Sequence, residues 1–291
     1  MTAALPAIQT QTLRRPARRR LRVGTLLRYL ALTLAALVII LPVYLAMITS
    51  ILPANEVATV PPHFVTLHPT FDNFRHVFRV VPMWRFLLNS TVVASCITLA
   101  QMATAALAAY AFVFLRFPFR RILFFLFLST LMVPAEATIV PNFQTILHLH
   151  WINTYQGLAV PFAATAFGTF LLRQFFLSLP KEILDAARVD GCGHLRTLWS
   201  VVLPLSRPAF ATLAAYAFLA AWNQYLWPLL ATNKPSMQTV QIGLKALVGN
   251  EASDPGLAMA GTVMALLPTM LLLILAQRHI VRGLTGGAVK G

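Results

Sequence analysis

The sequence predicts an all-α integral membrane protein with six transmembrane helices. Of its 291 residues, 58% are hydrophobic and only 11% are charged, whereas soluble globular domains carry about 25% charged residues. The apolar residues are gathered in six long windows, and most Lys and Arg residues fall on one side of the membrane that these windows define. Composition, window length and charge asymmetry together indicate this fold class.

Each predicted span is an apolar run close to the roughly 20 residues that a helix needs to cross a bilayer. The six windows are 26–52, 87–115, 122–140, 157–172, 208–230 and 257–276, of which the fourth is the shortest. A signal peptide is the alternative interpretation of the first window. That run is too long for the apolar part of a signal peptide and has no evident small-residue cleavage site, so a retained helix is expected.

The basic residues indicate the orientation of the spans. With the N-terminus inside, 18 of the 23 Lys and Arg residues lie in inside segments and 5 lie outside. Short inside loops of membrane proteins carry such an excess, so both termini are predicted to be cytoplasmic. The net charge of +15 and the Arg cluster at 14–20 would also suit nucleic acid. The membrane interpretation explains them better, and no nucleic-acid partner is predicted.

The spans divide the chain into five parts. These are a basic cytoplasmic tail (1–25), the first transmembrane helix (26–52), an extracytoplasmic segment (53–85), a core domain (86–280) with a charged loop at 178–207, and a cytoplasmic tail (281–291). In the extracytoplasmic segment, Phe71, Phe74 and Val77 recur at helical spacing and predict a short surface helix. His148 and His150 lack further ligands nearby, so no metal site is predicted.

The charged loop contrasts with the apolar spans around it, and residues 185–204 read DAARVDGCGHLRTLWSVVLP. Pro180 suits the first turn of a helix, and Gly191 suits the position past a helix end, where φ is often positive. The apolar residues that follow recur at i, i+3, i+4 and i+7, the spacing of one helix face. They are Leu195, Leu198, Trp199 and Val202. The loop is therefore predicted to be a helix, a glycine turn and a second helix.

Two roles suit such a loop: an interfacial anchor, or a docking element whose small alanines let another protein approach closely. Its spacing resembles the signature of ATP-binding-cassette (ABC) importer permeases, E-A-A-x(3)-G-x(9)-I-x-L-P. Here the pattern runs Asp185-Ala186-Ala187, three residues, Gly191, nine residues, Val201, one residue and Leu203-Pro204. Asp replaces Glu and Val replaces Ile. The resemblance implies the type I ABC importer permease fold, with this loop as the coupling helix seated in a cleft of an ATPase subunit.

The resemblance assigns a set of loop residues to ATPase coupling. They are Glu182, Asp185, Ala186, Ala187, Asp190, Gly191, Leu195, Leu198, Trp199, Leu203 and Pro204. Those expected to make the contact are Asp185, Ala186, Ala187 and Gly191.

The resemblance extends over most of the chain. Segments 84–90, 132–136, 170–176 and 222–228 look like the carbohydrate-uptake branch of the family, with its maltose-type second permease. The last of them, WNQYLWP, is similar to the second permease of sn-glycerol-3-phosphate importers, whereas 283–291 resembles the tail of di- and oligosaccharide permeases. The expected solute is sn-glycerol-3-phosphate or a related glycerophospho compound, with a neutral di- or oligosaccharide as the alternative.

Such an importer implies several partners in a prokaryotic cell membrane: a second permease in a heterodimer, two ABC ATPase subunits and an extracytoplasmic solute-binding protein. The sequence has no phosphate-binding loop G-x-x-x-x-G-K-[ST] and no catalytic constellation, so it is not predicted to be an enzyme. ATP and Mg are expected on the ATPase subunits, with no cofactor on this chain. A secondary transporter subunit or a membrane-anchored enzyme is the rival class. Neither an inverted repeat nor a nucleophile–base pair is visible to support them.

Polar residues within the predicted spans are candidates for the solute path. Glu136 would cost about 2.5–3.5 kcal/mol at mid-bilayer, so it either hydrogen-bonds another helix or lines a break beside Pro134. Four more candidates lie in the outer half of the fifth span, where they would form either an aromatic belt or a sugar-binding surface. They are Asn223, Gln224, Tyr225 and Trp227. No Lys or Arg lies deep in a span, so the binding protein or the partner permease is expected to recognise an anion.

Overall fold

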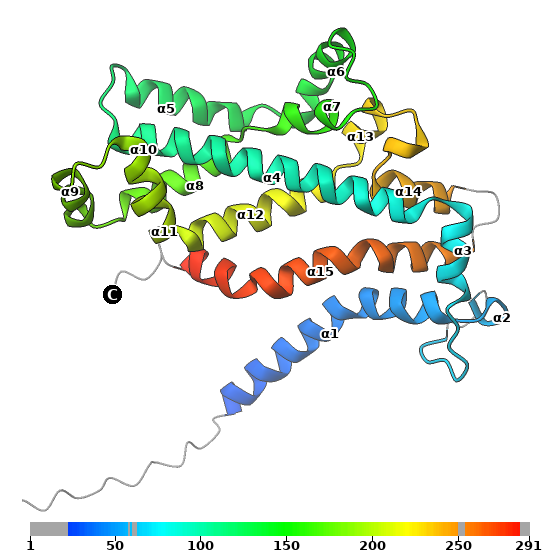
Figure 1. The fold of residues 1–291 in the computed structure, drawn as a ribbon. Coiled ribbons are helices and arrows are strands. Elements are labelled where there is room, and N and C mark those ends of the chain that lie inside the picture. Colours follow the sequence, from blue (N-terminus) through cyan, green and yellow to red (C-terminus); the bar gives the residue numbers. More distant parts are fainter. Residues whose placement is uncertain (1–22, 58, 60–62, 250–253, 286–291) are drawn as a thin grey trace, which may run out of the picture. The chain divides into compact units, whose positions relative to one another are not determined.

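The structure is a computed structural model, and it describes residues 23–57, 59, 63–249 and 254–285. Every regular element among these residues is a helix (Figure 1), as the sequence predicts. Most of the predicted N-terminal tail and the end of the C-terminal tail, 1–22 and 286–291, lie outside the described residues.

The helices follow one another along the chain, several of them as short segments. In order they are α1 (Val23–Ile51), α2 (Ala54–Val57), α3 (Asp72–Val80), α4 (Met83–Phe114), α5 (Arg120–Ser129), η1 (Thr130–Met132), η2 (Ala135–Thr138), α6 (Ile139–His148), α7 (Tyr155–Ala159), η3 (Val160–Phe162), α8 (Ala166–Leu177), α9 (Lys181–Val189), α10 (His194–Thr197), η4 (Leu198–Val202), α11 (Leu203–Leu205), α12 (Arg207–Trp222), α13 (Leu226–Ala231), η5 (Pro235–Met237), α14 (Val240–Val248) and α15 (Pro255–Thr285).

The chain forms two compact units, 1–45 and 46–291. Helix α1 runs from the first unit into the second, and the apolar side chains of its first part are exposed. A helix that is apolar all round suits a lipid environment. The predicted first span is confirmed as one continuous apolar helix, while its insertion in a membrane stays a prediction.

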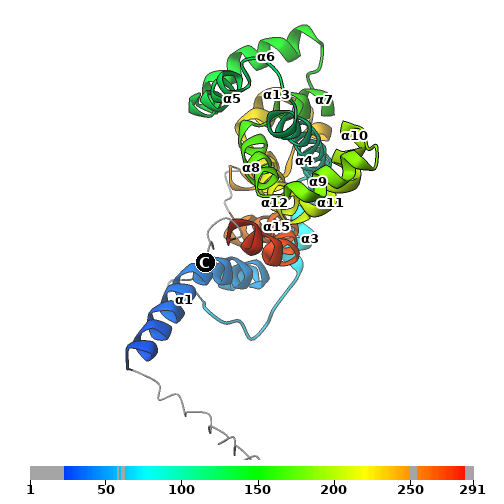
Figure 2. The same cartoon turned by 90° about the vertical axis from the view of Figure 1, so that its left-hand side faces the viewer.

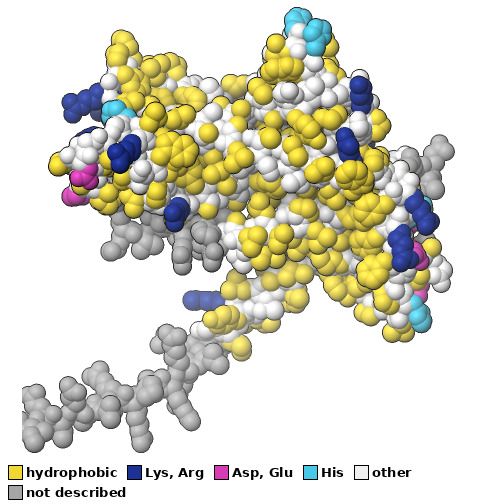
Figure 3. Space-filling model, in the orientation of Figure 1, with side chains coloured by type: hydrophobic (Ala, Val, Ile, Leu, Met, Phe, Trp, Pro, Cys, Tyr) yellow, Lys and Arg dark blue, Asp and Glu magenta, His cyan; other side chains and the backbone are white. Residues whose placement is uncertain are grey.

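Three helices are long and apolar enough to cross a membrane, and three bent helix pairs raise the number of candidate spans among the described residues to as many as six. The three helices are α1, α4 and α15. The pairs are Arg120–Met132 with Ala135–His148, Tyr155–Phe162 with Ala166–Leu177, and His194–Leu205 with Arg207–Trp222. In Figure 3, apolar side chains cover the middle of the visible face and charged side chains gather toward its ends. The six-span count and the orientation of the termini stay predictions.

The third predicted span is broken, in agreement with the break expected beside Pro134. Its two parts meet at 96°, at Val133 and Pro134. A proline favours extended backbone in the residue before it, and Val133 has φ −79° and ψ 118°. The second part remains helical to His148, beyond residue 140, where the third predicted window ends.

Two other predicted boundaries differ from the structure. The fifth window, 208–230, is not one helix, because α12 ends at Trp222 and α13 begins at Leu226. Helix α15 continues to Thr285, inside the predicted tail at 281–291. The short surface helix predicted from the Phe and Val spacing is confirmed as α3.

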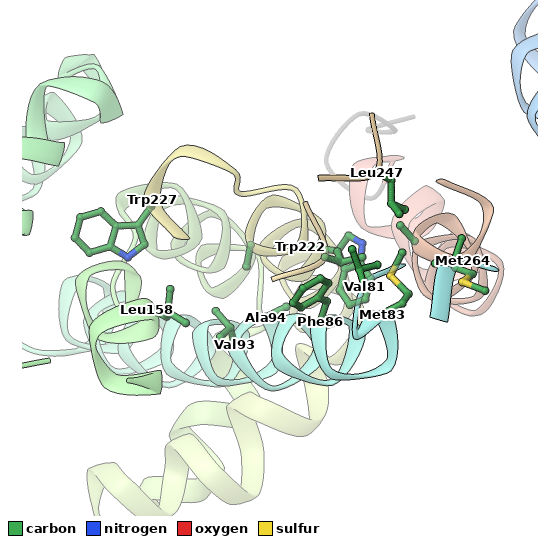
Figure 4. Packing of buried hydrophobic residues seen from close by; sticks show 14 of the residues in the cluster. Val81, Met83, Phe86, Val93, Ala94, Leu158, Trp222, Trp227, Leu247 and Met264 are labelled. Carbon is green, nitrogen blue, oxygen red and sulfur yellow. The ribbon is translucent and has the colours of Figure 1, made fainter. Parts of the chain in front are cut away.

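The core of the second unit is arranged around α4 (Figures 1 and 2). The first half of α4 packs with α12, α14 and α15, where Met83, Phe86 and Trp222 are among the largest buried side chains (Figure 4). Its second half packs with α8, α9 and η4 around Leu172 and Phe176. One helix therefore carries both halves of the core.

Polar side chains of α4 satisfy backbone groups in the broken segments. The Asn89 side chain, fully buried, donates to the carbonyls of Ser236 (3.0 Å) and Gln238 (2.8 Å) and accepts from the Tyr155 hydroxyl (2.8 Å). Farther along α4, the Gln101 amide donates to the carbonyl of Phe162 (2.9 Å). Buried backbone groups need such partners, so the side chains of α4 permit the neighbouring helices to be broken.

Replacing Asn89 with leucine should destabilise the protein. The variant keeps the volume but leaves the Gln238 carbonyl and the Tyr155 hydroxyl without their partner, each costing about 1–3 kcal/mol if no water reaches it, while the Ser236 carbonyl still accepts from Arg85 Nε (3.2 Å). We expect the unfolding temperature of the purified protein to fall by roughly 5 °C or more. Thr91→Val is the matched control, since the exposed Thr91 bonds only to Leu87 of its own helix. Equal unfolding temperatures for the two variants would contradict the role given to Asn89.

Candidate functional site

The charged loop forms the helix, glycine turn and helix that its sequence predicts. Helix α9 ends in a turn in which the Gly191 N–H donates to the Arg188 carbonyl (3.0 Å) and the Cys192 N–H to the Ala187 carbonyl (2.9 Å). Gly191 has φ +73°, a conformation that costs other residues free energy. The chain then resumes as α10, continues through the π-helix η4 and α11, and bends by 83° into α12.

Helix α9 has one buried face and one exposed face. Leu184 and Ala187 are buried, and Leu184 packs in the core cluster beneath α4 and α8. The exposed face carries Glu182, Asp185, Ala186 and Asp190. The two alanines of the motif therefore differ, because Ala186 is open to a partner while Ala187 faces the core of this chain. Ala187 is accordingly removed from the expected contact set.

The predicted apolar stripe of the second helix is divided. Leu198 and Val202 are buried, whereas Leu195 and Trp199 are 67% and 69% exposed. The two members of each pair are four residues apart. A wider π turn at Leu198–Val202 lies where the buried and the exposed pair diverge. One pair fixes the loop to the core, and the other pair is left on the surface.

The end of the motif lies beside an apolar hollow of about 640 Å³. Leu203 and Pro204 line it together with Trp199 and with Met102 of α4. These three loop residues thus line a hollow against α4 and α12.

The loop is attached to α4 by a polar contact. The Tyr110 hydroxyl lies 3.2 Å from His194 Nδ1, and the two rings meet edge to face with centroids 6.0 Å apart. Tyr110 is near the C-terminal end of α4, and His194 begins α10. The charged loop is therefore in direct contact with the central helix.

Both signs of charge are present at this end of the molecule. A hollow of about 910 Å³ beside α9 is lined by Asp185 and several basic residues. The basic residues are Arg116, Arg120, Arg121, Lys181 and Arg188. Arg188 pairs with Asp185 at 2.8 Å on the exposed surface. Mixed charge around a glycine turn suits docking of another protein in a fixed register.

The candidate solute path lies at the interruption between α12 and α13. Asn223 is exposed, Gln224 and Tyr225 are half-buried, and the Gln224 Oε1 atom is buried without a hydrogen-bond partner among the described residues. Trp227 is different. Its indole N–H donates to the Gly157 carbonyl (3.1 Å) in the core, so Trp227 is an internal anchor and is withdrawn from the path.

Glu136 lies in η2, directly after the 96° break in the third span, and its side chain is exposed. The break predicted beside it is present. Its contact with solute stays a prediction.

Helix α14 brings two polar residues to the interruption that were not among the predicted site residues. Lys245 Nζ lies 5.6 Å from the centroid of the Tyr225 ring. The Gln241 amide lies 3.4 Å from both the Trp222 carbonyl and Asn223 Oδ1. The sequence contains a pattern that indicates them, since Gln241 and Lys245 are four residues apart in a nine-residue run, VQIGLKALV, that is otherwise apolar. Among the described residues, no group of three or more His, Cys, Asp and Glu could hold a metal ion.

Comparison with known proteins is consistent with this geometry. Residues 101–286 match the family described as "Binding-protein-dependent transport system inner membrane component". The chain is 37% identical over 264 residues to the sn-glycerol-3-phosphate transport system permease protein UgpE of Yersinia enterocolitica, covering 88% of this chain and 94% of the relative. It is 38% identical to the protein of the same name in Agrobacterium fabrum, covering 90% and 96%.

Solved structures share the fold. A chain of a bacterial ABC transporter involved in the import of the acidic polysaccharide alginate superposes with a TM-score of 0.78 at 24% identity, covering 89% of this chain and 97% of that one. A second alginate ABC transporter structure, in complex with an alginate pentasaccharide-bound periplasmic protein, gives a TM-score of 0.60 at 12% identity, covering 87% and 93%. The all-helical arrangement is therefore that of an ABC importer permease.

Removing the Tyr110 hydroxyl should loosen the charged loop. In Tyr110→Phe the ring contacts remain while the contact with His194 is lost, at a cost of about 1 kcal/mol, or about fivefold in local opening. Amide hydrogen exchange at residues 191–197 should rise accordingly. Tyr216→Phe, at an exposed tyrosine of α12, is the control. Unchanged exchange in Tyr110→Phe would show that the contact does not hold the loop.

Proposed function

This chain belongs to the family of binding-protein-dependent transport system inner membrane components, and we propose that it forms half of the translocation pathway of an ATP-driven importer for sn-glycerol-3-phosphate or a related glycerophospho compound. One observation carries the proposal. The chain is 35% to 38% identical, over about nine-tenths of its length, to permeases named for that solute.

The proposed assembly contains this chain, a second permease, two ATPase subunits and an extracytoplasmic solute-binding protein. Support for the binding protein comes from the family description and from the similar structure that holds a periplasmic protein. Support for separate ATPase subunits comes from the sequence, which lacks a phosphate-binding loop. ATP and Mg would be held by those subunits. The assembly would lie in a prokaryotic inner membrane with the charged loop on the cytoplasmic side.

The proposed mechanism is alternating access driven through the charged loop. The exposed face of α9 would dock on the ATPase, and closure of the ATPase dimer around ATP would displace the loop. The buried pair Leu198 and Val202, together with the Tyr110–His194 contact, would pass this displacement to α4 and α12. A difference in docking free energy between the two ATPase states is what shifts the permease from one orientation to the other.

Replacing Gly191 should abolish coupling to the ATPase without preventing the protein from folding. Proline cannot adopt the φ of +73° and lacks the N–H that bonds to Arg188, so Gly191→Pro should remain in the membrane yet lose solute-stimulated ATP hydrolysis. Gly191→Ala is a milder variant. An added Cβ meets no atom within 4 Å, so only the conformation is penalised, by about 1–3 kcal/mol.

Added bulk on the exposed face of α9 tests the same docking without altering the turn. Ala186→Trp should reduce recovery of the ATPase subunit with this chain, whereas Ala54→Trp, on an exposed residue of α2, should not. Normal stimulation in Gly191→Pro, together with normal recovery in Ala186→Trp, would contradict the coupling role.

The solute is tested by uptake into vesicles that contain the complete importer. Labelled sn-glycerol-3-phosphate should accumulate only with ATP, and unlabelled glycerophospho compounds should compete, whereas neutral di- and oligosaccharides should not. Competition by a neutral oligosaccharide with no glycerol-3-phosphate uptake would replace the proposed solute with the alternative one. Accumulation without ATP would instead indicate a secondary transporter.

A further inference from the structure

The interruption between α12 and α13 receives a cation from α14. Lys245 Nζ lies 5.6 Å from the centroid of the Tyr225 ring, where the negative face of the ring favours the ammonium group. Gln241, one turn earlier on α14, contacts the Trp222 carbonyl and Asn223 Oδ1 at 3.4 Å. Two segments that are some twenty residues apart thus form one polar surface.

Within the described part of the chain, no carboxylate forms an ion pair with the Lys245 ammonium group. Among the described residues the ion pairs are Arg75 with Asp72 and Arg188 with Asp185, so none of those carboxylates neutralises Lys245. Its side chain is exposed, whereas the neighbouring Gln224 Oε1 is buried and has no hydrogen-bond partner within the described part of the chain. The surface therefore combines a positive charge and a phenol, beside a buried amide oxygen that lacks a hydrogen-bond partner.

Helix α14 holds Lys245 on a rigid support. The segment before it is bonded to α4, since the Val240 N–H donates to Ser90 Oγ (2.8 Å) and Asn89 bonds the Gln238 carbonyl. Gly243 packs directly on the Phe86 ring, where a Cβ would clash. The backbone that carries Lys245 is thus held in place before the solute arrives, which lowers the cost of binding it.

We propose that Lys245 binds the phosphate group of the transported solute on this subunit, with Tyr225 hydrogen-bonding its glycerol part. This inference rests on the proposed function, because it requires a solute that carries an anionic phosphate and several hydroxyl groups. It revises the expectation that only the binding protein and the partner permease would recognise the anion. Lys245 lies outside the apolar windows, so the lack of Lys and Arg deep in the predicted spans does not apply to it.

The test uses the complete importer in proteoliposomes, with the binding protein loaded with sn-glycerol-3-phosphate. Lys245→Gln should lower the uptake rate by about tenfold or more, since bonds to charged groups are the stronger ones. The number of solute molecules imported per ATP should fall as well, because the loaded binding protein still stimulates ATP hydrolysis. Lys245→Arg should retain most of the uptake. Lys234→Gln, at another exposed lysine predicted to be extracytoplasmic, is the matched control.

The outcomes separate this inference from the proposed function. Wild-type uptake of glycerol-3-phosphate with normal uptake in Lys245→Gln would overturn the inference alone. Equal losses in Lys245→Gln, Lys245→Arg and Lys234→Gln would also overturn it, because the effect would then not follow the charge at position 245. A wild-type importer that carries only neutral sugars would overturn both the inference and the proposed function.

Discussion

The structure depends on one constraint: a buried backbone polar group must have a hydrogen-bond partner, because neither an apolar core nor lipid supplies one. Continuous helices meet it by themselves, but the described chain contains three sharply bent helix pairs. Side chains of α4 supply the missing partners in neighbouring segments. Asn89 bonds the segment before α14, and Gln101 and Thr104 bond the carbonyls of Phe162 and Ala163. The Asn73 amide does the same for the carbonyls of Ser50 and Leu52 at the end of α1.

Because α4 supplies these hydrogen bonds, other polar side chains of this apolar protein are free to bind a solute or another protein. Side chains of α4 bond the backbone carbonyls of the broken segments, so the side chains within a break are not all needed to stabilise the fold. Gln224 and Tyr225 keep hydrogen-bonding capacity at one interruption, and α9 keeps a charged exposed face at the opposite end of the bundle. Trp227 shows the contrary case, since its indole N–H is committed to Gly157 and it serves the fold.

Sequence patterns predict the features that depend on local spacing. Hydropathy identifies α4 and α15, and the spacing around Gly191 identifies the turn whose φ is positive. Such patterns fail where distant segments meet. Nothing near Trp222 indicates that Gln241 and Lys245 lie beside it, because α14 is positioned by Asn89, about 150 residues away. Nor does periodicity reveal the π turn, since the i, i+4 spacing of Leu195 and Trp199 is the same whether that pair faces the core or the surface.

The length of α4 has a mechanical consequence. Its 32 residues form a rod of about 48 Å at 1.5 Å per residue. Asn89, near one end, holds the segment that carries Lys245, and Tyr110, near the other end, contacts the charged loop. A tilt of about 5° about its midpoint would move the two ends by about 2 Å in opposite directions, which is enough to break a hydrogen bond at each. The contacts at the two ends, toward α14 and toward the charged loop, are therefore linked through one rigid helix.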